Sequence, residues 1–127
     1  MGLAKDFKEL DVYQNAFASA KQIFEMTSAF PVEERYSLID QIRRSSRSVC
    51  TNIAEAWRKR RYPAAFVSKL TDADAEAAET LIWLDVALEC RYLDNDIHAQ
   101  LTNHYRHINA QLSKMMSASK QWRQTSS

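Results

Sequence analysis

The residues best suited to chemistry are cationic side chains gathered in one stretch of the sequence. Residues 35–61 hold eight Arg and Lys side chains against two acids, a local charge of +6. The candidates for binding phosphate groups are Arg43, Arg44, Arg47, Arg58, Lys59, Arg60 and Arg61. Each such contact would add to a salt-dependent affinity for RNA or DNA. Trp57 and Tyr62 lie nearby and offer aromatic rings on which unpaired bases can stack.

A stretch of opposite charge follows later in the same chain. Residues 72–96 hold eight acids against one arginine, a local charge of −7. Neighbouring helices of opposite charge attract each other, within one subunit or between two, although solvated pairs contribute little. The arginines therefore have two interpretations. They bind nucleic acid, or they pair with acids across a subunit interface in a pure protein–protein interaction module.

Patterns for catalysis or metal binding are absent from the sequence. A di-metal site in a helical bundle needs Glu three residues before His on two helices, and no Glu stands three residues before His98, His104 or His107. The only glycine is at position 2, which excludes glycine-rich phosphate loops. Cys50 and Cys90 are isolated, as in a reducing cytoplasm. We predict no catalytic residue, cofactor or metal; a metal-dependent bundle enzyme is the remote alternative.

Long helices must position these side chains, because one glycine and two prolines in 127 residues leave little material for tight turns. Apolar residues recurring at steps of three and four predict helices over about residues 11–29, 37–59, 63–91 and 95–119, followed by a tail at 123–127. Short connections make neighbouring helices antiparallel. The sequence therefore predicts one all-α domain, residues 1–127, folded as an antiparallel up-down-up-down four-helix bundle.

The second predicted helix has one apolar face and one face of small residues. Its apolar stripe is Leu38, Ile42, Val49, Ile53 and Ala56, with Ser45 and Ser46 filling the gap. Ser37 is the expected N-cap, and Asp94 or Asn95 is expected to cap the fourth helix. The stripe predicted for the first helix is wide: Tyr13, Ala16, Phe17, Ala20, Ile23, Phe24 and Thr27.

Four polar residues are predicted to form a structural network beside the core: Gln41, Asn52, Glu55 and Glu79. A buried polar group must find a partner, and such networks fix the register of helices more than they add stability. Arg43 or Arg44 is expected to meet Glu79 on the neighbouring helix.

Several motifs resemble those of a bacterial protein family. Gln41-Ile42-Arg43-Arg44-Ser45 followed by Asn52-Ile53-Ala54-Glu55 is similar to the signature of the proteins encoded in intervening sequences of 23S rRNA genes. Val12-Tyr13-Gln14, Phe30-Pro31 and Trp83-Leu84-Asp85 support the resemblance, which covers roughly residues 7 to 116. Ala56, Arg58 and Arg91 depart from it, since each stands where the family pattern has glycine.

The resemblance implies an antiparallel four-helix bundle without established enzymatic activity, and a homopentamer. It also implies a distant similarity to the accessory variability proteins of retroelements, in which a basic pentamer engages nucleic acid. We therefore expect a cytoplasmic, oligomeric scaffold or adaptor that binds RNA or DNA through its basic patch, or else an unidentified protein partner. No membrane association is expected, because no apolar run approaches about 20 residues.

Overall fold

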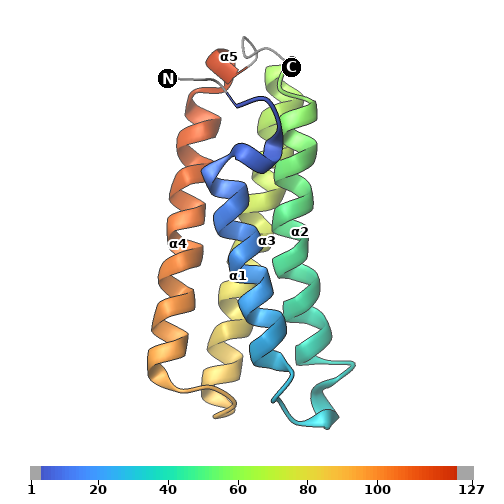
Figure 1. The fold of residues 1–127 in the computed structure, drawn as a ribbon, viewed down its shortest axis with the longest axis vertical. Helices are drawn as coiled ribbons and strands as arrows, with labels where there is room; N and C mark the ends of the chain where they lie inside the picture. Colours follow the sequence, from blue (N-terminus) through green and yellow to red (C-terminus); the bar gives the residue numbers. More distant parts are fainter. Residues whose placement is uncertain (1–3, 123–127) are drawn as a thin grey trace.

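The computed structural model describes residues 4–122, so the predicted tail at 123–127 lies outside the described residues. Four long helices dominate the fold (Figure 1): α1 (Asp11–Thr27), α2 (Leu38–Arg58), α3 (Pro63–Glu89) and α4 (Asn95–Ser117). Three short elements complete it: the 3-10 turns η1 (Phe7–Glu9) and η2 (Val32–Glu34), and the final helical turn α5 (Ser119–Trp122). The predicted all-α, antiparallel four-helix bundle is confirmed.

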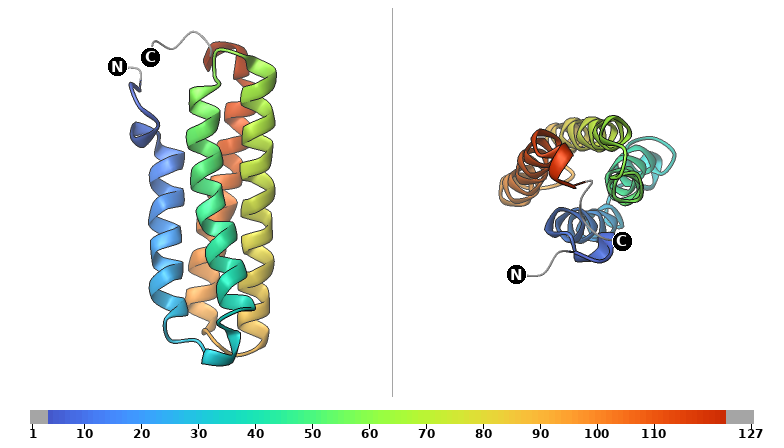
Figure 2. Two further views of the ribbon diagram at one scale, coloured as in Figure 1. Left: turned by 90° about the vertical axis from the view of Figure 1, so that its right-hand side faces the viewer. Right: turned by 90° about the horizontal axis from the view of Figure 1, so that it is seen from above.

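Each long helix packs against the two that flank it in the bundle. Contacts join α1 to α2, α2 to α3, α3 to α4 and α4 to α1, whereas α1 and α3 make no contact across the described residues. The view along the bundle shows α1 and α3 on opposite sides (Figure 2). The outer surfaces of α1 and α3 therefore belong to different sides of the molecule.

The core follows the predicted stripe of α2. Leu38, Ile42, Val49, Ile53 and Ala56 are all buried, and so are Ser45 and Ser46. Small residues at these positions let α3 approach α2 closely, because Ala73, Ala77 and Thr80 are fully buried on the facing side. The α2–α3 contact, called the α2–α3 seam below, is consequently the most extensive in the bundle.

Part of the stripe predicted for α1 is wrong. Phe17 is 56% exposed and Phe24 is 46% exposed, so neither belongs to the core. The buried residues of α1 are Val12, Ala16, Ser19, Ile23 and Thr27. Apolar residues cover more than half the circumference of this helix, and helical spacing alone does not say which of them face inward.

The capping predictions had mixed outcomes. Ser37 makes no side-chain cap, which corrects the expectation for α2. Glu34 takes that role, because its Oε1 accepts from the Leu38 amide at 3.3 Å while its Oε2 accepts from the Tyr92 hydroxyl at 2.8 Å. Asp94 caps α4 as predicted, accepting from the Ile97 amide at 2.8 Å.

The turn that ends α3 has an arginine at the position where glycine is usual. Arg91 has φ of 63°, a left-handed conformation that costs a residue with a Cβ atom free energy. The Tyr92 amide donates to the Ala87 carbonyl and the Arg91 amide to the Leu88 carbonyl, both at 2.9 Å. These two bonds form the Schellman motif that ends helices with a left-handed residue. The departure from glycine at this position is therefore tolerated within a conventional turn.

Candidate interaction surfaces

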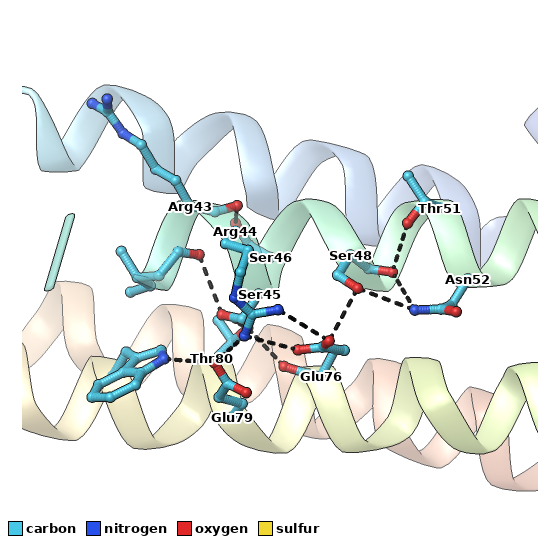
Figure 3. A network of polar contacts seen from close by, with 12 residues as sticks. Arg43, Arg44, Ser45, Ser46, Ser48, Thr51, Asn52, Glu76, Glu79 and Thr80 are labelled. Carbon is cyan, nitrogen blue, oxygen red and sulfur yellow. Dashed lines mark hydrogen bonds and ion pairs between the residues drawn. The ribbon is translucent and has the colours of Figure 1, made fainter. Parts of the chain in front are cut away.

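Arg44 is held by acids of the same chain. Its guanidinium lies 3.2 Å from a carboxylate oxygen of Glu76 and also contacts Glu79 (Figure 3). Trp83 donates to Glu79 from its indole nitrogen at 3.0 Å. The hydrogen bond from Trp83, followed by that from Arg44, lowers the pKa of Glu79, against the opposing effect of partial burial. Arg44 is thus engaged within the α2–α3 seam, where it meets Glu79 as predicted.

Small polar side chains extend this contact along the seam. Ser48 donates to Glu76 at 3.1 Å, and Asn52 donates to the Ser48 carbonyl at 2.9 Å (Figure 3). Deeper inside, the hydroxyls of Ser45 and Thr80 lie 2.8 Å apart, both fully buried. The buried hydroxyls of Ser45 and Thr80 are therefore partners of each other, which a close-packed polar seam requires.

The four residues predicted as one network are placed in three different ways. Asn52 and Glu79 join the α2–α3 seam contacts through other side chains. Glu55 forms a separate ion pair with Lys69 at 2.8 Å. Gln41 shares no side-chain hydrogen bond with these residues in the part of the chain that the structure describes. Sequence reasoning missed Ser48, Glu76 and Thr80, because their pairing depends on the relative register of two helices.

Arg43 points away from the acids, toward α1. Its Nε donates to the Thr27 hydroxyl at 2.8 Å and its Nη2 to the Phe24 carbonyl at 3.2 Å. The guanidinium carbon also lies 4.5 Å from the centre of the Phe24 ring. Arg47, one turn further along α2, is exposed and lies 5.8 Å from the same ring. Arg43 thus ties α1 to α2, whereas Arg47 remains at the surface.

Three aromatic rings of α1 and these two cations lie on the same side of the bundle, because Tyr13, Phe17 and Phe24 recur at steps of four and seven. The Tyr13 and Phe17 rings stack with centroids 6.0 Å apart, and Phe24 lies two turns beyond Phe17 on α1. We define the aromatic face by five residues: Tyr13, Phe17, Phe24, Arg43 and Arg47. Such large exposed rings are uncommon on the surface of a monomer, where contiguous apolar patches usually mark contact sites.

The outer side of α3 is apolar too. Ala75, Ala78, Ile82 and Val86 recur at steps of three, four and four, so they share one side of the helix. All four are exposed, with Ile82 57% and Val86 36% accessible. We call this surface the aliphatic face. Two exposed acids of α3 lie beside it in the sequence: Glu89, and Asp85, whose carboxylate is 2.7 Å from Nε2 of His98.

The basic run after Trp57 divides into an exposed part and a buried residue. Arg58, Lys59 and Arg61 are exposed, and Tyr62 is 65% accessible; we call these four residues the basic end. Arg60 is buried instead, with its guanidinium carbon 3.8 Å from the centre of the Trp57 ring. Burial and the neighbouring Arg58 and Arg61 lower the pKa of Arg60.

The predicted base-stacking role of Trp57 is wrong. Trp57 is only 2% exposed and its ring packs edge-on against Trp122, with centroids 6.2 Å apart. Arg60 covers it further and donates to the Trp57 carbonyl at 2.8 Å. Tyr62 is therefore the aromatic side chain that this end of the bundle presents outward.

The described residues offer neither a cluster for a metal ion nor a helix able to span a membrane. Within residues 4–122 no group of three or more His, Cys, Asp or Glu side chains is arranged to hold a metal ion. None of the described helices combines the length and apolarity needed to cross a membrane. Cys50 is buried, which raises its thiol pKa to about 11, whereas Cys90 is exposed.

Comparison with known proteins identifies the family. The family model for 23S rRNA-intervening sequence protein matches residues 8–114. The chain therefore belongs to this family, as the motifs in the sequence indicated. No protein with a curated description matches it.

A solved structure shows the same architecture. It is the crystal structure of a protein of unknown function from the S23 ribosomal protein family of Bacteroides thetaiotaomicron. That protein is 27% identical to this chain, with a TM-score of 0.75 over 84% of this chain and 95% of the other. The similarity supports the bundle and the family but brings no activity, because the function of that protein is itself unknown.

Proposed function

We propose that this protein is a non-enzymatic scaffold that assembles from several copies of itself. The observation that carries the proposal is the exposure of large apolar residues on two sides of the bundle, Phe17 and Phe24 on α1 and Ile82 on α3. Soluble monomers seldom present such patches. Burying one phenylalanine or isoleucine side chain stabilises an interface by roughly 1.5–3 kcal/mol.

The charged seam supports this reading indirectly. Arg43 and Arg44 are engaged with partners in the same chain, which is one of the two arrangements that opposite charges on neighbouring helices predicted. The apolar faces are then the better candidates for contact between copies. Five copies is the stoichiometry that the family resemblance implies. Two unpaired cysteines within the described chain are in keeping with a cytoplasmic location.

Light scattering coupled to size exclusion tests the scaffold function. The purified protein, treated with nuclease, should elute with a mass that is a whole multiple of 14.7 kDa. On dilution, this mass should stay constant until the protein concentration approaches the dissociation constant of the assembly. A mass of 14.7 kDa at every concentration would overturn the proposal.

A second candidate function is binding of single-stranded RNA or DNA at the basic end. Its support is that Arg58, Lys59 and Arg61 are exposed and form no ion pair among the described residues, while Tyr62 stands beside them. Cations next to an exposed ring suit a nucleic-acid strand, whose phosphates need charge and whose bases stack.

The nucleic-acid function is tested by a salt titration of binding to a fluorescent oligonucleotide. Replacing Arg58, Lys59 and Arg61 with Gln should weaken binding and reduce the slope of log K against log salt by about 2, since each lost phosphate contact removes roughly 0.7. The matched control replaces three exposed cations elsewhere, Lys21, Arg106 and Lys114. An equal effect in both variants would show that only net charge matters.

A further inference from the structure

We propose that a hollow on the outer side of α2 binds an anion that carries linked phosphate groups. The hollow has a volume of about 530 Å³, within the range of about 300–1,000 Å³ that is typical of small-molecule sites. Four arginines line it: Arg35, Arg43, Arg44 and Arg47. This site is separate from the basic end, which follows α2, and it depends neither on the scaffold function nor on binding of RNA or DNA.

The local sequence brings these arginines to one side of α2. Arg43 and Arg47 are four residues apart and Arg44 follows Arg43, so their side chains leave the helix on the same or neighbouring faces. Arg43 points toward α1 and Arg44 toward α3 (Figure 3), and both line the hollow. Arg35 adds a fourth guanidinium from the turn that joins η2 to α2.

Three of the four arginines keep a charge that no acid of the described chain pairs with. Arg44 is the exception, because two acids of α3 hold its guanidinium. Arg43 donates from Nε and Nη2 to neutral oxygens of α1. Arg35 and Arg47 form no ion pair among residues 4–122 and contact only an aromatic ring each.

Few acids oppose this charge. Asp40 is the one acid among the described residues that line the hollow. Glu25 on α1 and Glu33 in η2 are also exposed, but neither lines the hollow or pairs with its arginines in the described part of the chain. Three unpaired arginines against one acid leave the lining with a surplus of two positive charges.

The donors in the hollow suit phosphate. Guanidinium groups form paired, planar hydrogen bonds with phosphate oxygens. The hydroxyls of Ser48 and Thr51 already donate to Glu76 and to the Ser48 carbonyl, so the arginines supply the available donors. Linked phosphate groups place several negative charges within one hollow, whereas a nucleic-acid strand spreads single charges along an open track. Arginines gathered around one hollow therefore favour linked phosphates.

An exposed aromatic ring adjoins the hollow. Tyr36 is 85% exposed, and the guanidinium carbon of Arg35 lies 5.9 Å from the centre of its ring. A nucleoside polyphosphate can therefore stack its base on Tyr36 while its phosphates reach the arginines. Inorganic polyphosphate would use the arginines alone. The two ligands share their phosphate chemistry and differ in whether they need Tyr36.

Isothermal titration calorimetry at constant ionic strength tests the site on the nuclease-treated, full-length protein. The probes are ATP, inorganic tripolyphosphate and orthophosphate. The test variant carries Arg35→Gln and Arg47→Gln at two exposed positions and keeps the two arginines that join helices. The matched control carries Arg106→Gln and Lys114→Gln, which remove two exposed cations of α4. Circular dichroism checks that each variant is folded.

Tripolyphosphate should bind about tenfold or more tighter than orthophosphate, because it reaches more than one arginine. The test variant should lose about tenfold or more in affinity for tripolyphosphate, whereas the control should stay within about twofold, since distant charges are screened. Arg35→Gln alone, which lies outside the aromatic face, replaces the double variant if that variant misfolds or changes its assembly. Tyr36→Ala assigns the ligand: weaker binding of ATP alone indicates a nucleotide, and unchanged binding of both probes indicates inorganic polyphosphate.

Three outcomes would overturn the proposal. One is tripolyphosphate that does not bind, or binds no tighter than orthophosphate. Another is an equal loss in the control, which would show that only net charge matters. The third is an oligothymidine without terminal phosphates that displaces tripolyphosphate from a variant lacking the basic end (Arg58→Gln, Lys59→Gln and Arg61→Gln), because the hollow would then bind a nucleic-acid strand. None of these outcomes bears on the scaffold function, which the mass alone decides.

Discussion

The α2–α3 seam and the outer faces of α1 and α3 differ in whether their side chains have partners within the chain. In the seam, polar groups find partners inside the chain: Ser45 with Thr80, and Arg44 with Glu76. On the outer faces, large apolar groups such as Phe17 and Ile82 remain exposed. The polar groups of the seam have partners within one chain, whereas the apolar groups of the outer faces are left accessible.

This difference indicates which surfaces are available for contact between copies. Opposite charge on α2 and α3 predicted attraction within one subunit or between two, and the ion pairs of Arg44 join helices of one chain. Exposed ion pairs of this kind contribute only about 0–1 kcal/mol each. Apolar burial is larger per residue and is still available on the outer faces.

The largest effect is expected from enlarging one residue of the seam. Ser45→Leu inserts a large side chain at a fully buried site and removes the partner of Thr80, so it should lower the free energy of unfolding by roughly 1–3 kcal/mol or more. Ala78→Leu makes a similar enlargement on the exposed aliphatic face and should change unfolding by less than about 0.5 kcal/mol. Urea unfolding of both variants makes the comparison; equal losses would contradict it.

The next effect distinguishes two neighbouring arginines. Arg43→Met removes a charged donor from the nearly buried Thr27 hydroxyl and should destabilise the monomer by about 1–3 kcal/mol. Arg47→Met should leave unfolding nearly unchanged, because Arg47 is an exposed member of the aromatic face, but it should raise the dissociation constant of the assembly. Unfolding curves and sedimentation are measured for both. The reverse result would contradict this assignment, because it would show that Arg47, and not Arg43, stabilises the monomer.

A smaller gain is expected at the end of α3. Arg91→Gly relieves the left-handed conformation at φ 63° and should raise the free energy of unfolding by about 1 kcal/mol. Assembly should not change, since Arg91 lies beyond both outer faces. Thermal unfolding measures the gain, and a loss of stability would show that the Arg91 side chain contributes more than its backbone costs.

The smallest effect is a pH dependence of stability at the end of the bundle where the α1–α2 and α3–α4 connections lie. The hydrogen bond from Tyr92 lowers the pKa of Glu34, so this stabilisation is present above the ordinary value of 4.5 and is lost as pH falls. The same bond raises the pKa of Tyr92 to about 12, so its stabilisation is present below pH 10 and is lost as pH rises through about 12. Tyr92→Phe should therefore flatten the stability profile at both extremes, measured by urea unfolding between pH 3 and 11. An unchanged profile would contradict the assignment.

Much of the fold follows from apolar spacing. The stripe of α2, from Leu38 to Ala56, is buried as predicted, because one face of that helix is clearly apolar. The spacing misplaced Phe17 and Phe24, because α1 is apolar around much of its surface. The spacing did not predict the exposed alanines and Ile82 on the outer side of α3 either, because α3 has apolar residues on both its inner and outer sides.

The interaction surfaces were less predictable than the fold. The arginine cluster was visible in the sequence, but its division among Thr27, Glu76 and the surface depends on how α1, α2 and α3 align. The burial of Arg60 over Trp57 depends on where the chain turns after α2. Such features need three-dimensional register, which the spacing of residues within one helix does not contain.

The most direct test of the central claim is the mass of the wild-type protein in 0.1 M and in 1 M NaCl, measured by sedimentation equilibrium after nuclease treatment. An assembly held by the aromatic and aliphatic faces should keep its mass in high salt, because apolar contacts are not screened. Dissociation to 14.7 kDa in 1 M NaCl would show that charge holds the copies together and would contradict the account.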